Sequence, residues 1–273
     1  MNIKFKKTIN TKKNYAHPPI PHGYRKIKGR WSTGYTIRDK VGNYSVWVPA
    51  GSILDILDTN ISAEHLAVKF KDGSSMIFDF TSKKAYTEYI KTDKYKSTLK
   101  YGGFYIGKYP ISTNYTSMSD EKVLTGLYYS EYKQASKELS FEDTQAELTY
   151  ETEHDLLLMW LQLAEILTVD ELCKDSSSIG IYFNQSYYEE FGPFYTSESK
   201  ERTVFGISDL CGNYWEILQG STFIDNVRYA SKVGGSWDEL GNVYPAAKKV
   251  LVSTSFKKSP AYNICARHSL KLK

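Results

Sequence analysis

The stretch "FGISDLCGNYWEILQG", residues 205–220, holds a Gly-Asn pair three residues before a Glu, with an Asp just upstream and a Trp between. Two interpretations are open. The stretch is either a polar turn over a buried Trp215, with Glu216 bonding backbone N–H groups, or a loop that holds a ligand. The rest of the chain has to decide between them.

The composition is that of a globular protein. The chain has 273 residues, 41% hydrophobic and 24% charged, enough for one large domain or two small ones. It contains 23 Tyr and 12 Phe. Tyr suits binding surfaces and half-buried strands, although the codon bias of an AT-rich genome would produce the same enrichment.

Charge and cysteine content exclude several classes of function. The net charge of +4 gathers at the two ends, and no basic face with interleaved aromatics appears, so nucleic-acid binding is not predicted. The three cysteines, Cys173, Cys211 and Cys265, form no CxxC pair and indicate neither a zinc site nor a disulfide framework. With no signal peptide or membrane-spanning run in the sequence, we expect synthesis in the cytoplasm and no membrane contact.

The pattern along the chain predicts one α+β domain, residues 34–273, behind a basic, Pro-rich N-terminal arm, residues 1–33. Two hairpins are expected in residues 34–51, with Gly42 in the turn, and in residues 66–80. Another strand is expected within residues 100–112. The segment from 113 to 147 is polar, with helical character around "SEYKQASKELS".

The clearest helix lies in "TYETEHDLLLMWLQLAEIL", from Thr149, with Thr152 and Asp155 spaced as a capping box. One face carries its apolar side chains, Leu156, Met159, Trp160, Leu163 and Ile166. A short helix capped by Thr168 and Glu171 follows. After it comes a long, Tyr-rich irregular segment, which in a compact domain is typical of a functional loop. No long helix is expected in the last ninety residues.

Five fragments, taken in order, resemble the formylglycine-generating enzyme (sulfatase-modifying factor) family. They are "GYTIRDKVGNYSVWVPAG", "GGFYIGKYPIS", the helix after "LTYETEHD", "GISDLCGNYWEI" and "VGGSWDE". The corresponding family slots read approximately WVPVG, GGFYISRYEVS, LPTEAEWE, LYDMAGNVWEW and RGGSW. The version most similar is the one found in Firmicutes and their phages. The resemblance covers residue 34 to the C-terminus and implies a C-type-lectin-like fold with a small twisted sheet, a few helices and long structured loops.

The resemblance implies a structural calcium ion at the opening stretch. Its ligands would be the carboxylates of Asp209 and Glu216 and the carbonyls of Gly212 and Tyr214. Calcium takes six to eight oxygens of this mixed kind. The polar turn over Trp215 remains the alternative.

The family's oxidase chemistry uses two cysteines after the GGS strand, which bind copper. Here the slots fall at or near Tyr244 and Lys249, so the copper site is not predicted. Cys211 is expected to be a buried core thiol. His154 is expected at the surface or in a cap, and adjacent carboxylates such as Asp238-Glu239 are expected to be solvated.

The sequence therefore favours a non-catalytic, lectin-like recognition or structural protein from a phage or prophage virion. The predicted ligand-binding residues are Tyr187, Tyr188, Tyr195, Trp237, Asp238 and Tyr244. Expected partners are a cell-surface glycan or protein, and other virion proteins through the arm. The main alternative is an oxidoreductase of the same family with a divergent site. A purely structural virion component, for example a homo-oligomer, is a third possibility.

Overall fold

The computed structural model describes residues 18–30, 33–51, 53–54, 65–69, 75–183, 196, 203–220, 222–254 and 262–273, with the backbone alone for 65–69 and 75–83. Its main element is a six-stranded antiparallel sheet. Its strands are, from edge to edge, β1 (Arg25–Lys28), β2 (Thr36–Arg38), β3 (Tyr44–Val48), β6 (Phe104–Gly107), β15 (His268–Leu272) and β7 (Thr144–Leu148). The expected hairpin around Gly42 is confirmed, with φ 125° at that glycine.

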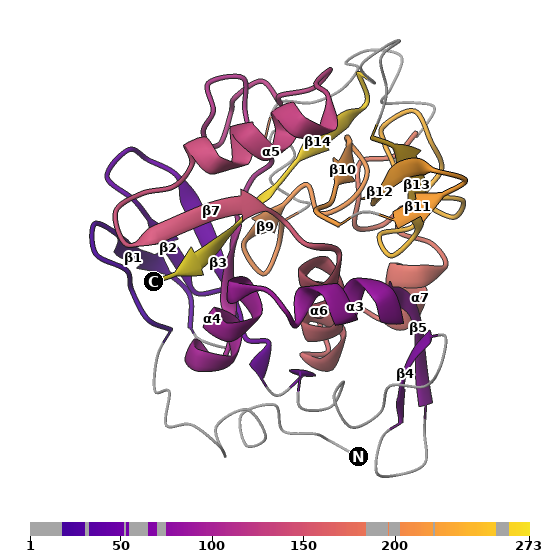
Figure 1. Ribbon diagram of the computed structural model, residues 1–273, viewed down its shortest axis with the longest axis horizontal. Helices are drawn as coiled ribbons and strands as arrows, with labels where there is room; N and C mark the ends of the chain where they lie inside the picture. Colours follow the sequence, from indigo (N-terminus) through magenta and orange to yellow (C-terminus); the bar gives the residue numbers. More distant parts are fainter. Residues whose placement is uncertain are drawn as a thin grey trace.

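Strands β3, β6 and β15 of the sheet are largely buried on both faces, whereas edge strand β1 is exposed. Along β3, Val46 and Val48 point into one core, and Trp47 between them points into a second, where its ring lies 4.9 Å from that of Tyr105. The first core is closed by α6 (Glu151–Leu163), together with α3 (Lys83–Tyr89) and α4 (Asp93–Tyr101). The second is closed by α5 (Tyr129–Glu138), and Figure 1 shows these helices on opposite sides of the sheet.

A second sheet carries the C-terminal part of the chain. It comprises β11 (Thr222–Ile224), β12 (Val227–Val233), β10 (Trp215–Ile217) and β14 (Ile264–Ala266), with β13 (Lys249–Ser253) also paired to β12. The pairing of β10 with β14 is parallel, and the others are antiparallel. Because β14 and β15 are separated by Arg267 alone, the end of the chain ties the two sheets together.

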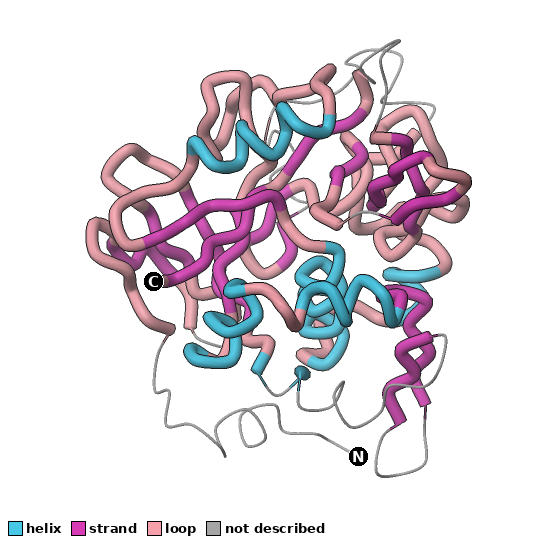
Figure 2. The backbone as a smooth tube through the Cα atoms, viewed as in Figure 1, coloured by secondary structure: helices cyan, strands magenta, loops and turns pink. Residues whose placement is uncertain are grey.

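Two short hairpins complete the strands: β4 (His65–Lys69) with β5 (Ser75–Ser82), and β8 (Thr203–Val204) with β9 (Ile207–Ser208). Long loops join the elements, as Figure 2 shows, and no long helix occurs among the described residues after α7 (Val169–Cys173). The α+β class with long structured loops is thus confirmed. No helix in the described part of the chain is long and apolar enough to cross a membrane.

The main helix differs from the expectation in two respects. It begins two residues earlier than predicted, with Tyr150 as the N-cap in place of Thr152, because Glu153 Oε2 accepts from the backbone N–H of Tyr150 at 3.1 Å. Every residue from Thr152 to Leu161 is buried, His154 included, so α6 has no solvent face over that range and the predicted surface position of His154 is wrong. Ile166, expected on the apolar face, lies beyond the helix and is 39% exposed. The cap of α7 by Thr168 and Glu171 is confirmed.

Part of the expected N-terminal arm joins the main sheet. Residues 25–28 form edge strand β1, and the hydroxyl of Tyr105 donates to the carbonyl of Pro19 at 3.1 Å. Residues 1–17 of the arm lie outside the described residues.

Candidate functional site

The opening stretch forms strand β9, a tight loop and strand β10. Asp209, Gly212 and Asn213 all have positive φ, between 51° and 66°. Gly212 N–H donates to the carbonyl of Gly234 at 2.7 Å, and a Cβ on Gly212 would lie 2.2 Å from the carbonyl oxygen of Ile181. Only glycine fits so close an approach of two backbones. The loop therefore holds the start of the next loop, residues 234–244, in place.

Arg267 holds this loop in place through hydrogen bonds. It is buried, and its guanidinium donates to Glu216 Oε1 from Nε at 2.9 Å and from Nη2 at 2.5 Å. Nη1 donates to the backbone carbonyls of Gly107 and Lys108, and Nη2 also approaches those of Ser208 and Asp209, all at 2.9–3.0 Å. The sequence does not reveal this network, in which one arginine links both sheets.

The four expected calcium ligands belong to this loop. Glu216 Oε1 is paired with the guanidinium of Arg267, and the backbone carbonyl of Asp209, which is not its predicted ligand atom, accepts a hydrogen bond from the same guanidinium. No group of three or more His, Cys, Asp or Glu side chains that could hold a metal occurs in the described ranges. Trp215 is fully buried, as the polar-turn interpretation requires, although Glu216 bonds a guanidinium in place of backbone N–H groups. The calcium ion stays a prediction.

The loop that follows β12, residues 234–244, gathers two carboxylates around one hydroxyl. Ser236 Oγ lies 2.5 Å from Asp238 Oδ1 and 3.0 Å from Glu239 Oε2, and Glu239 Oε2 also accepts from the backbone N–H of Ser236. A hydroxyl carries one proton and can donate to only one of them at a time. The Nδ2 of Asn263 approaches the same oxygen at 3.5 Å. The expectation of a solvated pair holds for Asp238, which is exposed, whereas Glu239 is partly buried. The two residues lie on a turn, where both reach the same atom.

Aromatic side chains and one cation flank this cluster. The rings of Trp215 and Tyr244 meet edge-on with centroids 5.2 Å apart, and Lys232 Nζ stands 4.0 Å from the centroid of the Trp215 ring. The hydroxyl of Tyr182 closes the loop by donating towards the carbonyls of Gly234 and Tyr244, at 2.7 and 2.9 Å.

Burial changes the pKa of two groups in this cluster, Glu239 and Lys232. Partial burial raises the pKa of Glu239 above its usual value, although the hydrogen bond from Ser236 and the charge of Lys232 oppose the rise. Partial burial also lowers the pKa of Lys232. Together these groups offer hydrogen-bond acceptors, a donor and aromatic edges at one end of β12.

Of the predicted ligand-binding residues, Trp237, Asp238 and Tyr244 belong to this one loop. Asp238 is exposed, and the other two are partly buried. Tyr187, Tyr188 and Tyr195 lie outside the described residues. Sequence reasoning missed Lys232, Ser236 and Glu239. The Ser-x-x-Glu spacing at 236–239, which resembles a capping box, was the available signal.

The positions compared with the copper-binding cysteines carry other chemistry. Tyr244 packs on Trp215, and Lys249 Nζ binds Glu151 Oε1 at 3.0 Å and Asp155 Oδ2 at 2.7 Å. Cys211 and Cys265 are buried, which confirms the expectation of a buried thiol for Cys211. Burial also raises the pKa of Cys265 well above its usual value. A thiol held protonated is a poor ligand for Cu(I), so these residues do not fit the family's copper site.

No family model and no curated protein matches the sequence. Solved structures do match. The structure of PvdO from Pseudomonas aeruginosa aligns with a TM-score of 0.53 and 12% identity, covering 90% of this chain and 100% of that one. The fold is formylglycine-generating-enzyme-like. The crystal structure of CarF also matches, with a TM-score of 0.44 and 11% identity over 63% of this chain and 87% of that one. At such identities the likeness to PvdO shows the fold alone.

Proposed function

We propose that this protein is a non-catalytic recognition protein that binds a hydroxyl-rich ligand, such as a cell-surface glycan, at the loop of residues 234–244. The observation that carries the proposal is the pair of carboxylates that meet at Ser236 Oγ beside Trp237 and Tyr244. Sugar hydroxyls donate to carboxylates, and aromatic rings cover the apolar faces of sugar rings. Asp238, the exposed carboxylate, would make the first contact.

The architecture supports this assignment. The loop is fixed at both ends, by Tyr182 and by the Gly212–Gly234 hydrogen bond, so little conformational entropy is lost when a ligand binds. Its polar groups are held on a strand end of a rigid sheet, the arrangement that suits a binding site. The residues at the compared copper positions, Tyr244 and Lys249, supply no thiolate.

The proposal is tested by titrating a panel of neutral mono- and oligosaccharides by saturation-transfer NMR, with wild type and Asp238→Asn. We expect saturable binding that Asp238→Asn weakens about tenfold or more, since a hydrogen bond to a charged group contributes about 1.5–3 kcal/mol. Asp225→Asn is the matched control, because Asp225 is an exposed aspartate in the turn at the other end of β12. Equal binding by all three proteins, or none by any, would overturn the proposal.

The second candidate is an oxidoreductase with a divergent site, favoured by the fold itself. The fold is shared with formylglycine-generating enzymes, and Glu239, with its raised pKa, could exchange protons beside Ser236. The test is oxygen consumption with a cysteine-containing peptide after incubation with Cu(I) or Fe(II). Turnover above that of free metal, lost in Glu239→Gln, would establish this candidate and displace the first.

Two further proposals rest on the family resemblance. The first is that the protein is part of a phage or prophage virion, and the second is that the N-terminal arm binds another virion protein. Co-purification of the protein with induced phage particles would test both.

A further inference from the structure

Three basic residues lie in one row across the first strands of the main sheet, far in the sequence from the loop of residues 234–244: Arg25, Arg38 and, beyond Tyr44, Lys108. Arg25 on β1 stands directly opposite Arg38 on β2, and Arg38 stands opposite Tyr44 on β3. Residues directly opposite each other on antiparallel strands share a face of the sheet. The backbone N–H of Lys108, just after β6, donates to the carbonyl of Tyr44 at 2.9 Å and extends the row.

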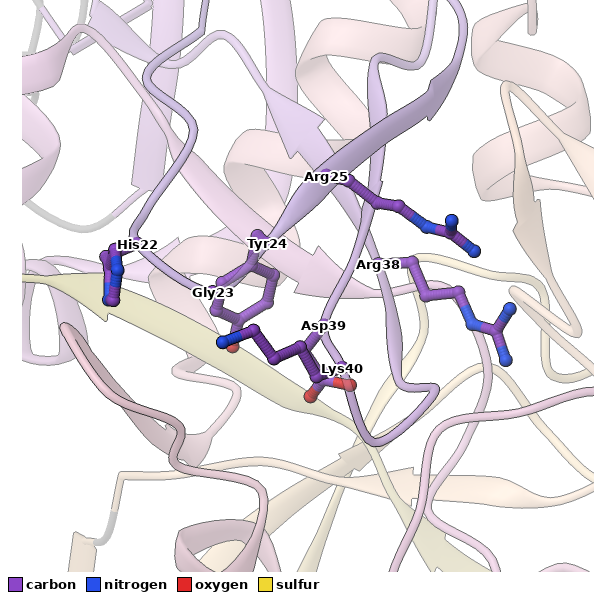
Figure 3. A pocket seen from close by; sticks show the side chains of 7 residues that line it. All are labelled: His22, Gly23, Tyr24, Arg25, Arg38, Asp39 and Lys40. Carbon is purple, nitrogen blue, oxygen red and sulfur yellow. The ribbon is translucent and has the colours of Figure 1, made fainter.

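Arg25 and Arg38 line a surface hollow with a volume of about 550 Å³. Figure 3 shows both side chains extending in the same direction from neighbouring strands, whereas Lys40 extends the other way. Neighbouring strands lie about 4.8 Å apart, so the two guanidinium groups can reach a single small anion.

The acidic groups near this hollow are already occupied. Asp39 accepts hydrogen bonds on both oxygens, from the backbone N–H groups of Gly42 and Asn43 and from Asn43 Nδ2, at 2.7–2.9 Å. Glu142 binds His22 and, at 3.5 Å, Lys40. Within the described ranges, neither Arg25 nor Arg38 has a carboxylate partner. Like charges placed directly opposite each other on a sheet destabilise it. When no anion is bound, the Arg25–Arg38 pair therefore lowers the stability of the folded protein.

Arg38 is held in place without being neutralised. Its Nε donates to the carbonyl of Gly42 at 3.3 Å, and its Cζ lies 5.1 Å from the centroid of the Tyr44 ring. Lys108 Nζ adds a further positive charge, 5.7 Å from the same ring centroid and 4.7 Å from that of Tyr109. The ring thus packs against the guanidinium of Arg38, and the Nη atoms of Arg38 make no hydrogen bond to any described residue, so they can bind a ligand.

We propose that Arg25 and Arg38 form a binding site for a tetrahedral oxyanion, the phosphate or sulfate ester group of a larger ligand. Paired guanidinium groups supply parallel N–H donors that match the edges of such an anion. The site is independent of the proposed glycan site, because it lies on a different sheet and uses none of the same residues.

The test is NMR titration of the arginine Nε–Hε resonances with inorganic phosphate, inorganic sulfate and acetate, at pH 8 and constant ionic strength. We expect saturable shifts with phosphate or sulfate, at lower concentration than with acetate. Arg25→Gln should weaken the affinity about ten- to a hundredfold, the equivalent of losing one charged hydrogen bond. Because Arg25 is exposed, this variant should fold, and relief of the like-charge contact should leave its unfolding midpoint in acetate equal to or above that of wild type.

Arg30→Gln is the matched control. It removes the same charge from an exposed position after β1 that does not line the hollow, and it should titrate as wild type does. Para-nitrophenyl phosphate and para-nitrophenyl sulfate then distinguish the two esters, and binding of either supports the site. Equal responses of Arg25→Gln and wild type, acetate binding as tight as phosphate, or no saturable shift would overturn it.

Discussion

At the scale of single residues, the decisive contact is the buried pair of Arg267 and Glu216. Removing one partner of a buried ion pair leaves the other charge uncompensated, which costs about 3–5 kcal/mol. We therefore expect Glu216→Gln to lower the free energy of unfolding by about that amount, measured by urea denaturation. Asp170→Asn, which breaks the exposed pair with Lys174, should change stability little. A loss no larger in Glu216→Gln than in this control would contradict the assigned role.

The same pair gives a direct test of calcium. If Arg267 supplies the positive charge at Glu216, the thermal midpoint should be the same in EDTA and in millimolar Ca²⁺. Asp209→Ala should then lower it equally in both. A calcium-dependent rise that Asp209→Ala abolishes would establish the calcium site instead, since a ligand at a hundred times its dissociation constant adds about 2.7 kcal/mol.

Burial was predictable at this scale, whereas long-range partners were not. Cys211 is buried as expected and Trp215 as the polar-turn interpretation requires, because apolar character is a property of the residue itself. The pairing of Arg267 with Glu216 joins positions 51 residues apart, and local sequence carries no signal for it. Asp238 and Glu239 were taken as solvated because they were placed on a strand. The turn that brings them together depends on Ser236.

At the scale of elements, Lys249 on β13 links the second sheet to helix α6 through ion pairs. It binds Glu151 and Asp155, and burial raises the pKa of Asp155 while the charge of Lys249 opposes that rise. Lys249→Met should leave Asp155 buried without a cation and cost about 3–5 kcal/mol. The measurement is urea unfolding, with amide exchange of α6 and β13 to localise the loss. Lys248→Met, at the exposed neighbouring position, is the control, and equal stabilities of the two variants would exclude the fastening role.

Elements that depend on local chemistry were predicted well. The hairpin around Gly42 follows from a turn that needs positive φ, and α7 follows from its capping Thr168 and Glu171. Helix α6 was predicted to have one apolar face but is buried all round. Its acidic residues Glu153 and Asp155 are paired with Lys94 and Lys249, from other elements. Periodicity cannot reveal such distant partners.

At the scale of the whole molecule, the order of the strands in the sheets could not be predicted from the sequence. The last strand, β15, lies between β6 and β7, and strand β10 pairs in parallel with β14. Both sheets are therefore incomplete without the C-terminal residues of the chain. Pairings of this kind depend on contacts between distant parts of the chain. The family resemblance anticipated the fold class, and the likeness to PvdO agrees with it.

His268 makes the whole molecule sensitive to acid. It lies on β15, between β6 and β7 in the main sheet, with its ring against Gly107, where a Cβ would stand 2.6–2.7 Å from its atoms. Burial, with Lys94 and Arg267 nearby, lowers its pKa from 6.5 to about 3. Between these values the unfolded chain binds a proton that the folded protein excludes, so stability is full above pH 6.5 and falls as the pH decreases.

We expect His268→Gln to remove this dependence. Each pH unit below 6.5 costs up to about 1.4 kcal/mol through this group, so by pH 5 the loss of stability from pH 7 should be about 2 kcal/mol smaller in the variant. Urea unfolding at pH 7, 6 and 5 measures it, and His22→Gln, on an exposed side chain, controls for the loss of a histidine. The buried carboxyl groups titrate in all three proteins, so the difference between the curves isolates His268. Parallel curves for wild type and His268→Gln would mean that the folded protein accepts a proton at this position as readily as the unfolded chain does.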